Sequence, residues 1–335
     1  MKVYGLPYRG SKSKIAADII ATLPPADTFV DLFAGGCAIT HAALLSGKYK
    51  TVIANDINEG MVRLFEDAWA GRLAGREREW ITREGFLARK DTDAYVATVW
   101  SFGNNGQDYL YGQQREEAKH ALHDAIVFND FDRMRKEYGQ TITNIAEDTL
   151  NTIETLHDRR VTLQNLLKKT TGTRAFIPHL TQADSVNNIA SLQYRAQHLE
   201  RAERVYDIER AHTLTTLRTT HGDYRDAEIP TGDTVIYCDP PYKDTGGYGI
   251  EFDFDGFRSW AAACPHQLFV SEYAMPTDTF ASVWGTVKQV TFAAQTNSLY
   301  RTEHLYTQRR FATATPTQLS LFTEAELSGG TLNFA

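Results

Sequence analysis

Short apolar runs, glycine turns and amphipathic segments alternate along the first seventy residues. Residues 28–33, TFVDLF, form an apolar run that is followed by AGG and by the helical pattern CAITHAALLS. Residues 51–56, TVIAND, form a second run, which precedes the amphipathic segment INEGMVRLFEDAWAG. The alternation predicts a βαβα unit with parallel strands, and therefore an α/β fold with a doubly wound, Rossmann-like sheet.

The pattern changes over residues 72–216, which are rich in charged and amide residues and lack strand alternation. Apolar positions there recur at helical spacing, at Leu122, Ile126, Ile142, Ile145, Leu150, Ile153 and Leu156. Strand signals return at residues 234–242, 266–273 and 287–294. We therefore expect an α/β domain of residues 1–71 and 217–311, with a mainly helical domain of residues 72–216 inserted. Residues 312–335 are rich in Thr, Ser and Gly, which predicts a flexible tail.

Composition also indicates the cellular compartment of the protein. The sequence has no apolar run of signal-peptide length and none near the roughly 20 residues of a membrane span, so we expect a soluble cytoplasmic protein. Its three cysteines, Cys37, Cys238 and Cys264, show no CxxC spacing. We expect them to be buried small side chains in a reducing compartment, and we expect no metal site. A monomer is the simplest expectation.

Charge is unevenly distributed. The net charge of −7 argues against a surface wholly devoted to nucleic acid. Residues 159–218, however, contain ten basic residues and five acidic ones, a local net charge of +5. Within this region Lys168, Lys169 and Arg174 lie in a short polar segment that suits phosphate contacts, although a solvated helix end explains them equally well.

The first glycine turn and the acid that follows the second run suit a nucleotide-like ligand. Glycines in DLFAGG allow close approach of backbone to a ligand at a helix N-terminus. Asp56 ends the second run, where a carboxylate can accept hydrogen bonds from ribose hydroxyls. This spacing fits a dinucleotide site or a methyl-donor site, but the GxGxxG pattern is absent, which disfavours dinucleotides.

The most informative motif is Asp239-Pro240-Pro241-Tyr242, which directly follows the apolar run VIYC. The two prolines make the turn rigid and hold the Pro240 carbonyl outward as an acceptor. Asp239 adds an anionic acceptor, so an exocyclic amine with two N–H donors can be held and its lone pair drawn out of conjugation. Tyr242 supplies a flat face on which a base extruded from a duplex can stack. The motif therefore predicts chemistry on the amino group of a base.

In this order, DLFAGG, the Asp56 motif NDIN, GDY at residues 222–224 and DPPY resemble the Dam-type, D12 class N6-adenine DNA methyltransferases. YRGSK at residues 8–12 is similar to the family's opening cofactor motif, and RTEHLY at residues 301–306 to its C-terminal segment. The resemblance implies a doubly wound methyltransferase sheet with an inserted helical target-recognition domain. It also implies S-adenosylmethionine as methyl donor and double-stranded DNA as substrate, with N6 of a flipped adenine as the acceptor.

The resemblance also implies roles for individual residues. Tyr8 and Lys12 would contact the methyl donor, with Lys12 near its carboxylate. Asp31, Phe33 and Gly35 would line its methionine part.

For the rest of the methyl donor, the resemblance implies that Asp56 holds the ribose hydroxyls. Asp223 would accept from the donor's adenine amino group, and the backbone of Tyr224 would contact its ring. The carboxylate and carbonyl of Asp239-Pro240 and the ring of Tyr242 keep the roles given by their chemistry. Most catalysis would then come from positioning and from polar acceptors preset for the charge that develops on N6.

The tail contains Gln318, Leu319, Leu321 and Phe322 in QLSLF, which is similar to the peptide by which bacterial polymerases and repair proteins bind the replication sliding clamp. Such a peptide would order on binding. A tail that packs back on its own domain is the alternative.

Other functions stay open at this point. DPPY-like loops also serve N4-cytosine and RNA amino methylation, and an inactive, clamp-tethered nucleic-acid-binding protein is a further alternative. A restriction-modification role, replication-linked marking and a mobile-element role are all compatible with the motifs.

Overall fold

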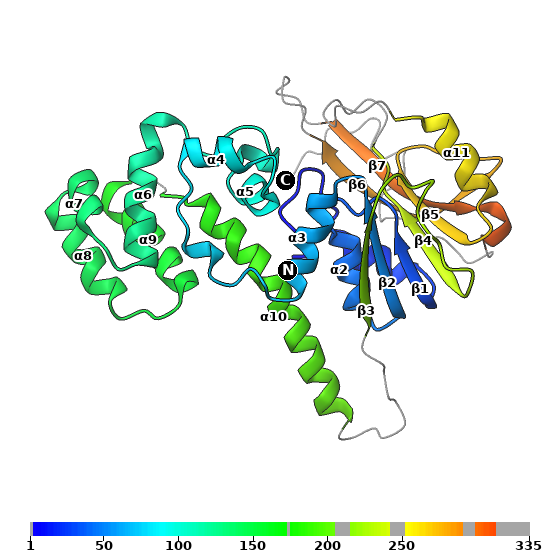
Figure 1. Cartoon of the computed structure of the whole chain (residues 1–335), viewed down its shortest axis with the longest axis horizontal. Helices are drawn as coiled ribbons and strands as arrows, with labels where there is room; N and C mark the ends of the chain where they lie inside the picture. Colours follow the sequence, from blue (N-terminus) through cyan, green and yellow to red (C-terminus); the bar gives the residue numbers. More distant parts are fainter. Residues whose placement is uncertain (1–2, 173–174, 205–214, 242–251, 291–298, 313–335) are drawn as a thin grey trace, which may run out of the picture. The chain divides into compact units, whose positions relative to one another are not determined.

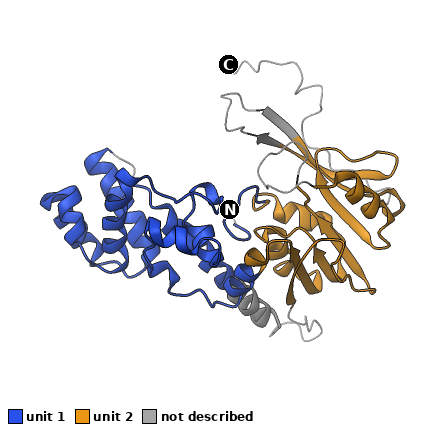
Figure 2. Cartoon of the chain, turned by 45° about the horizontal axis from the view of Figure 1, so that its top comes forward, with its two compact units in different colours: residues 1, 3–11, 63–207 blue, residues 2, 12–62, 208–335 orange. Residues whose placement is uncertain are grey.

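The computed structural model describes residues 3–172, 175–204, 215–241, 252–290 and 299–312. The chain divides into two compact units, coloured blue (unit 1) and orange (unit 2) in Figure 2. Unit 1 contains residues 3–11 and 63–207, and unit 2 contains residues 12–62 and 208–335.

Unit 2 is built on a seven-stranded sheet with the order β3-β2-β1-β4-β5-β7-β6 (Figure 1). Its strands are β1 (Ala26–Asp31), β2 (Tyr49–Asp56), β3 (Thr216–His221), β4 (Thr234–Cys238), β5 (Gln267–Glu272), β6 (Phe280–Val290) and β7 (Leu299–Gln308). Strands β1 to β5 pair in parallel, and β7 is antiparallel to both β5 and β6. The predicted doubly wound α/β fold is confirmed.

Helices cover both faces of this sheet. Helix α11 (Phe254–Ala263) packs through Phe257 and Ala261 on the face that carries Val30, Ile53 and Ile236. The opposite face of β1 and β2 contacts α2 (Ala38–Leu44), which packs on α1 (Ala16–Thr22). Side chains alternate between the two faces of a strand, so the continuous apolar runs of β1, β2 and β4 follow from burial on both sides.

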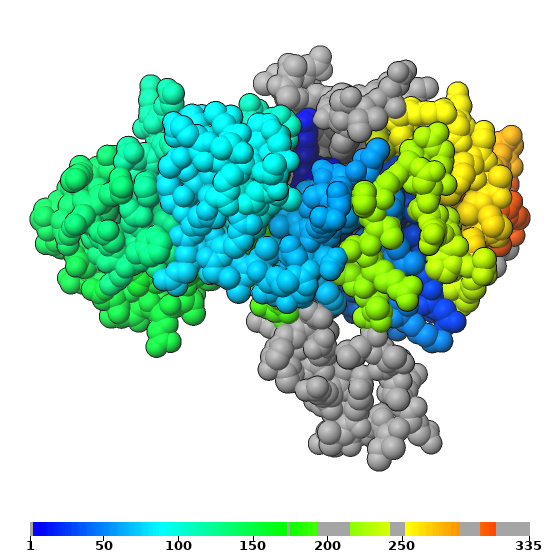
Figure 3. Space-filling view, in the orientation of Figure 1, coloured from blue at the N-terminus to red at the C-terminus, as the bar shows by residue number. Residues whose placement is uncertain are grey.

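Unit 1 is helical. It contains α4 (Arg83–Arg89), α5 (Ala94–Val99), α6 (Gln113–Val127), α7 (Asp132–Tyr138), α8 (Gln140–Leu150), α9 (Leu156–Thr171) and α10 (Pro178–Arg204). Helix α3 (Glu59–Trp69) leads from unit 2 into unit 1. Most positions of the predicted helical periodicity lie in an apolar core, in which Leu122 and Ile126 of α6 pack with Leu150 of α8 and Leu163 of α9, whereas Ile145 is 43% exposed. Figure 3 shows the surface around α4 and α5, in cyan, adjoining that of the green helices.

Two buried histidines in unit 1 form a hydrogen-bonded chain. Nδ1 of His123 lies 3.0 Å from Nε2 of His179, whose Nδ1 lies 2.6 Å from the hydroxyl of Tyr111. Nε2 of His123 lies 3.2 Å from the carbonyl oxygen of Arg78. Burial lowers the pKa of His123 to about 4 and the pKa of His179 well below its usual value. Both rings are therefore neutral in the folded protein at neutral pH.

The neutral, buried His123 predicts that the protein loses stability as the pH falls. The pKa of His123 is about 4 in the folded protein and 6.5 without the fold, so the unfolded state binds the extra proton between these values. The free energy of unfolding of wild type relative to His123→Gln should fall by about 3 kcal/mol as the pH is lowered from 6.5 to 4. Urea denaturation at several pH values measures this difference. A difference that does not change with pH would contradict the prediction.

The described residues include no helix that is both long enough and apolar enough to cross a membrane. The three cysteines are free and buried, as predicted.

Candidate active site

The sheet of unit 2 has a topological switch point between β1 and β4. From β1 the chain proceeds to β2 and β3 on one side, whereas β4 and β5 lie on the other side (Figure 1). In open α/β sheets, ligands bind beyond the carboxyl ends of the strands at such a point. The predicted site residues Asp31 and Asp239 end or directly follow the two strands that flank it.

The glycine turn after β1 is held by backbone and carboxylate contacts. The N–H of Gly35 donates to Oδ2 of Asp56 at 2.7 Å, and the N–H of Ala34 donates to the carbonyl of Asn55 at 2.9 Å. Gly35 has φ of 47°, a left-handed conformation that glycine adopts at little cost. Cys37, at the start of α2, has φ of 56°. The turn is therefore fastened to the end of β2, beside Asp56.

Asp31 is buried at the end of β1. Its Oδ2 accepts hydrogen bonds from the backbone N–H and the hydroxyl of Thr40, at 3.1 and 2.7 Å. Its Oδ1 is buried and has no hydrogen-bond partner. Burial raises the pKa of Asp31 to about 7, against the hydrogen bonds from Thr40 and together with the charges of Asp239 and Asp56. Asp31 thus anchors α2 with one oxygen and leaves the other available.

Asp56 ends β2, as predicted. Its Oδ1 accepts from the N–H of Asn58 at 2.8 Å, so each of its oxygens has one backbone donor. Burial raises its pKa, although the bonds from Asn58 and Gly35 oppose this shift. A carboxylate oxygen can accept two hydrogen bonds, so both oxygens keep acceptor capacity.

Asp239 is held by a lysine from far away in the sequence. The ammonium of Lys12 donates to both oxygens of Asp239, at 2.7 and 2.6 Å. Lys12 is only 4% exposed, and its Nζ also lies 3.5 Å from Oε1 of Glu303 in β7. Burial opposes the charge on Lys12, but Asp239 and Glu303 outweigh it and raise the lysine pKa. The structure therefore places the predicted catalytic acid in a buried ion-pair cluster.

The rest of the DPPY turn is partly described. Pro240 is buried and Pro241 is half-buried at the end of β4. Tyr242 lies outside the described residues. Tyr8 belongs to unit 1, so its predicted contact with the methyl donor stays a prediction.

The GDY segment lies just after β3. Arg225 donates to both oxygens of Asp223, at 2.7 and 2.9 Å, and these hydrogen bonds lower the pKa of Asp223. Tyr224 is buried with its ring 5.3 Å from that of Phe33, which follows β1. Phe252 packs on both of these rings. An aromatic cluster thus lies beside the glycine turn.

Three charged groups at this edge were not predicted as site residues. They are Glu303, Glu272 and Arg225. Glu272 ends β5 and is buried, and burial raises its pKa to about 7 with help from the charge of Asp239. Glu303 had a signal in the sequence, because it lies within RTEHLY. No sequence feature indicated Arg225, apart from its position two residues after Asp223.

The basic region of residues 159–218 is less exposed than its charge suggests. Lys168 and Lys169 are exposed at the end of α9, and Arg174 lies outside the described residues. Arg159 and Arg160, which contribute to the net charge of +5, are buried. The guanidinium of Arg159 donates to the carbonyls of Ala125, Ile126 and Leu150 and to the side chain of Asn129. These two arginines bond inside unit 1, so they add to the local net charge without adding surface cations.

The loop at residues 100–112 of unit 1 presents an exposed aromatic side chain. Ser101 and Tyr109 form an antiparallel bridge, and the N–H of Phe102 donates to the carbonyl of Asp108 at 2.8 Å. Asn105 accepts from the N–H of Asp108 at 3.1 Å, which closes the turn. Phe102 is nevertheless 67% exposed. The loop is therefore tied together internally and holds an aromatic ring in solvent.

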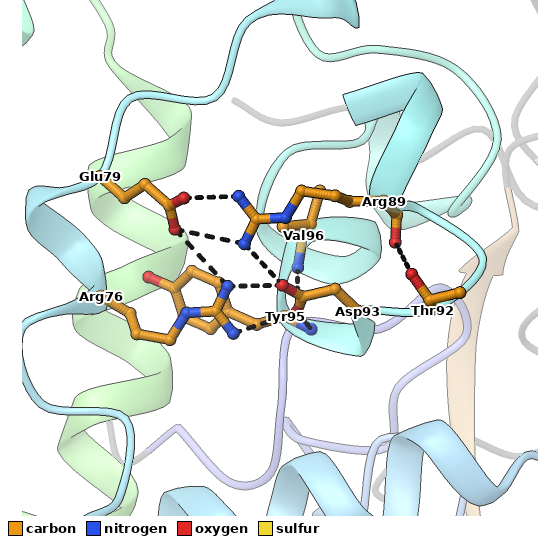
Figure 4. Close-up of polar contacts among 7 residues, drawn as sticks. All are labelled: Arg76, Glu79, Arg89, Thr92, Asp93, Tyr95 and Val96. Carbon is orange, nitrogen blue, oxygen red and sulfur yellow. Dashed lines mark hydrogen bonds and ion pairs between the residues drawn. The ribbon is translucent and has the colours of Figure 1, made fainter. Parts of the chain in front are cut away.

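A charged network supports the helix that leads into this loop (Figure 4). Asp93 accepts from Arg76 at 3.0 and 2.7 Å and from Arg89 at 2.8 Å, and it also caps the first N–H groups of α5. Arg89 donates to Glu79 as well. Burial opposes ionisation of Asp93, but the bonds from the two arginines outweigh it and lower the pKa of Asp93 to about 2. The network therefore fixes the start of α5.

Among the described residues, no group of three or more His, Cys, Asp or Glu side chains is arranged to hold a metal ion.

The sheet, its switch point and its acidic edge define unit 2 as an α/β enzyme domain of Rossmann-like fold.

The family model of the D12 class N6 adenine-specific DNA methyltransferases matches residues 8–306, and the chain belongs to this family. The resemblance inferred from the motifs is thus confirmed, and the protein is an adenine-specific DNA methyltransferase. A comparison with curated protein sequences gives no match.

Proposed function

We propose that the protein transfers a methyl group from S-adenosylmethionine to N6 of an adenine flipped out of duplex DNA, at the edge that carries Asp239. The observation that carries this proposal is the position of Asp239, directly after β4 and beside the switch point, with Asp31 at the end of β1 and Asp56 at the end of β2. Family membership supports the adenine target.

The residues around the glycine turn fit this methyl donor. Oδ1 of Asp31 is a buried acceptor without a partner, which suits a group with N–H donors such as the ammonium of the methionine part. Asp56 keeps acceptor capacity for two ribose hydroxyls. Phe33 would line the methionine part, and Tyr224, whose ring lies 5.3 Å from that of Phe33, would contact the ring of the adenine part through its backbone.

Asp223 is the proposed acceptor for the amino group of the donor's adenine. In the structure both of its oxygens bond to Arg225. The adenine amino group would use the remaining acceptor capacity of this carboxylate.

The donor supplies a methyl group on a sulfonium, which is already activated for transfer. The chain therefore has to position the amine and stabilise its developing charge. Asp239 and the carbonyl of Pro240 accept the two N–H donors of N6, and the rigid proline turn fixes them in place. Lys12 fixes the orientation of Asp239 through two hydrogen bonds. Tyr242 would stack on the flipped adenine.

We propose that unit 1 contacts DNA through the loop at residues 100–112 and through Lys168 and Lys169, and that Arg174, outside the described residues, contributes as well. An exposed ring on an internally bonded loop can stack on a base or wedge between bases without losing much conformational entropy. The two lysines would contact phosphates.

Phe102 provides the test of this contact. Phe102→Ala should weaken binding to duplex DNA about tenfold, the effect of losing one aromatic stacking contact. Leu87→Ala is the matched control, because Leu87 is a similarly exposed apolar residue in α4 of the same unit. Fluorescence anisotropy with a labelled duplex measures both. Equal affinities for the two variants would remove Phe102 from the DNA contact.

The tail offers a second, separate contact. We propose that QLSLF, with Gln318, Leu319, Leu321 and Phe322, docks on the bacterial sliding clamp; these residues lie outside the described part of the chain. Calorimetry of the full chain and of a chain truncated after residue 312, each titrated with purified clamp, tests this. Equal affinity for both chains would contradict it.

The proposed reaction is tested by following labelled methyl transfer. The protein is incubated with S-adenosylmethionine carrying a tritiated methyl group and with DNA or RNA duplexes of matched sequence. We expect label in DNA. Label in RNA alone, or none despite measured binding of S-adenosylmethionine, would contradict the proposal.

A further inference from the structure

Glu303 is a buried carboxylate at the active edge with no part in the chemistry proposed above. It lies in β7 and is 1% exposed. Its Oε1 approaches Nζ of Lys12 to 3.5 Å, on an ammonium that already donates to both oxygens of Asp239. One cation is thus shared by two carboxylates that come from β7 and from the end of β4. A buried carboxylate is costly, so its retention beside this lysine calls for a physical reason.

The charges of the cluster supply that reason. Lys12 and Asp239 alone form a neutral pair, and a neutral pair attracts a developing cation only weakly. Glu303 brings the cluster to a net charge of −1. During methyl transfer, N6 forms a bond to carbon as the carbon–sulfur bond breaks, and the nitrogen is positive until one proton leaves. A site that is already negative stabilises that charge without reorganising.

Glu303 also fixes the lysine. Lys12 is almost fully buried, and burial by itself disfavours its ammonium. Asp239 and Glu303 together overcome this and raise the pKa of Lys12. The lysine therefore stays charged, with its Nζ within reach of both carboxylates, and the carboxylate of Asp239 is fixed in turn.

We propose that Glu303 is a positioning residue for methyl transfer, which acts through Lys12 by holding its ammonium and offsetting its charge, so that Asp239 presents a net negative site to the target amine. This inference rests on the proposed function of Asp239. Glu303 itself touches neither the base nor the methyl donor in this account.

The first test separates turnover from binding. Glu303→Gln keeps the size of the side chain but removes its charge. We expect the single-turnover rate at saturating DNA and S-adenosylmethionine to fall on the order of 10- to 100-fold. The Kd for S-adenosylmethionine, measured by calorimetry, should change less than about threefold. Glu303→Asp should recover part of the rate. Glu228→Gln, an exposed acid of the same unit, is the control for charge removal.

The double variant Lys12→Met/Glu303→Gln distinguishes action through Lys12 from a separate structural role. If Glu303 acts through Lys12, adding Glu303→Gln to Lys12→Met should not slow methyl transfer further, whereas two independent lesions would multiply their losses. Thermal unfolding of each variant reports on stability independently of activity.

The results of these tests distinguish a failure of the inference about Glu303 from a failure of the proposed function. A wild-type rate in Glu303→Gln, or a double variant slower than Lys12→Met alone, would overturn the inference while leaving the proposed function intact. Failure of the wild-type protein to methylate DNA would overturn the proposed function, and the inference with it.

Discussion

Asp239→Asn lowers the single-turnover rate of methylation on the order of 10²- to 10³-fold and leaves the affinity for S-adenosylmethionine almost unchanged. The amide keeps the shape of the side chain but removes the anionic acceptor that is preset for charge developing on N6. Most contacts proposed for the methyl donor involve Asp31, Asp56, Asp223 and the glycine turn, and Lys12, expected near the donor's carboxylate, keeps Glu303 as a partner, so donor binding should be largely spared. Rapid-quench kinetics and calorimetry measure the two quantities.

The position of Lys12 makes this variant a fair test. Its ammonium loses a charged partner but keeps Glu303 at 3.5 Å, so the variant should fold. Parallel losses of rate and of S-adenosylmethionine affinity would show that Asp239 serves the donor site instead. An unchanged rate would remove Asp239 from the chemistry.

The second large effect is on stability. Arg159→Met should lower the free energy of unfolding by about 3 to 5 kcal/mol, because it removes the side-chain donor from the buried carbonyls of Ala125 and Ile126. The carbonyl of Leu150 loses this donor too but keeps the N–H of Ile153 at 3.1 Å. Lys168→Met, on the exposed face of the same helix, should change it by less than about 0.5 kcal/mol. Chemical denaturation followed by circular dichroism compares the two.

The same pair of variants separates folding from DNA binding. Folded Arg159→Met protein should bind duplex DNA as wild type does, whereas Lys168→Met should bind more weakly and with a smaller dependence on salt. A loss of stability from Lys168→Met as large as that from Arg159→Met would contradict this division of roles.

The strands that sequence could predict are those buried on both faces. β1, β2, β4 and β5 read as continuous apolar runs, and the structure has strands at all four. β3 was missed because it is an edge strand with alternately exposed, polar side chains. β6 begins at Phe280, earlier than the predicted residue 287, and residues 291–294 of the prediction lie outside the described chain.

β7 was noticed only as the motif RTEHLY, without a strand being predicted there. Its polar residues Glu303, Thr307 and Gln308 are buried, and the sequence gives no indication of that burial.

For the site, the sequence identified groups but not their partners. Motif order placed Asp31, Asp56 and Asp239 at strand ends, and parallel strands bring those ends to one edge. The pairing of Lys12 with Asp239 spans 227 positions and depends on tertiary structure. The addition of Glu303 to that pair likewise follows only from the sheet order. For Arg159 the sequence did not reveal burial. Local charge cannot distinguish an exposed cation from one that donates hydrogen bonds to buried carbonyls.

The most direct measurement is nucleoside mass spectrometry of mixed-sequence duplex DNA after incubation with S-adenosylmethionine and either the wild-type protein or Asp239→Ala. The account predicts N6-methyldeoxyadenosine with wild type and none with the variant. N4-methyldeoxycytidine, or equal N6-methyldeoxyadenosine from both proteins, would contradict it.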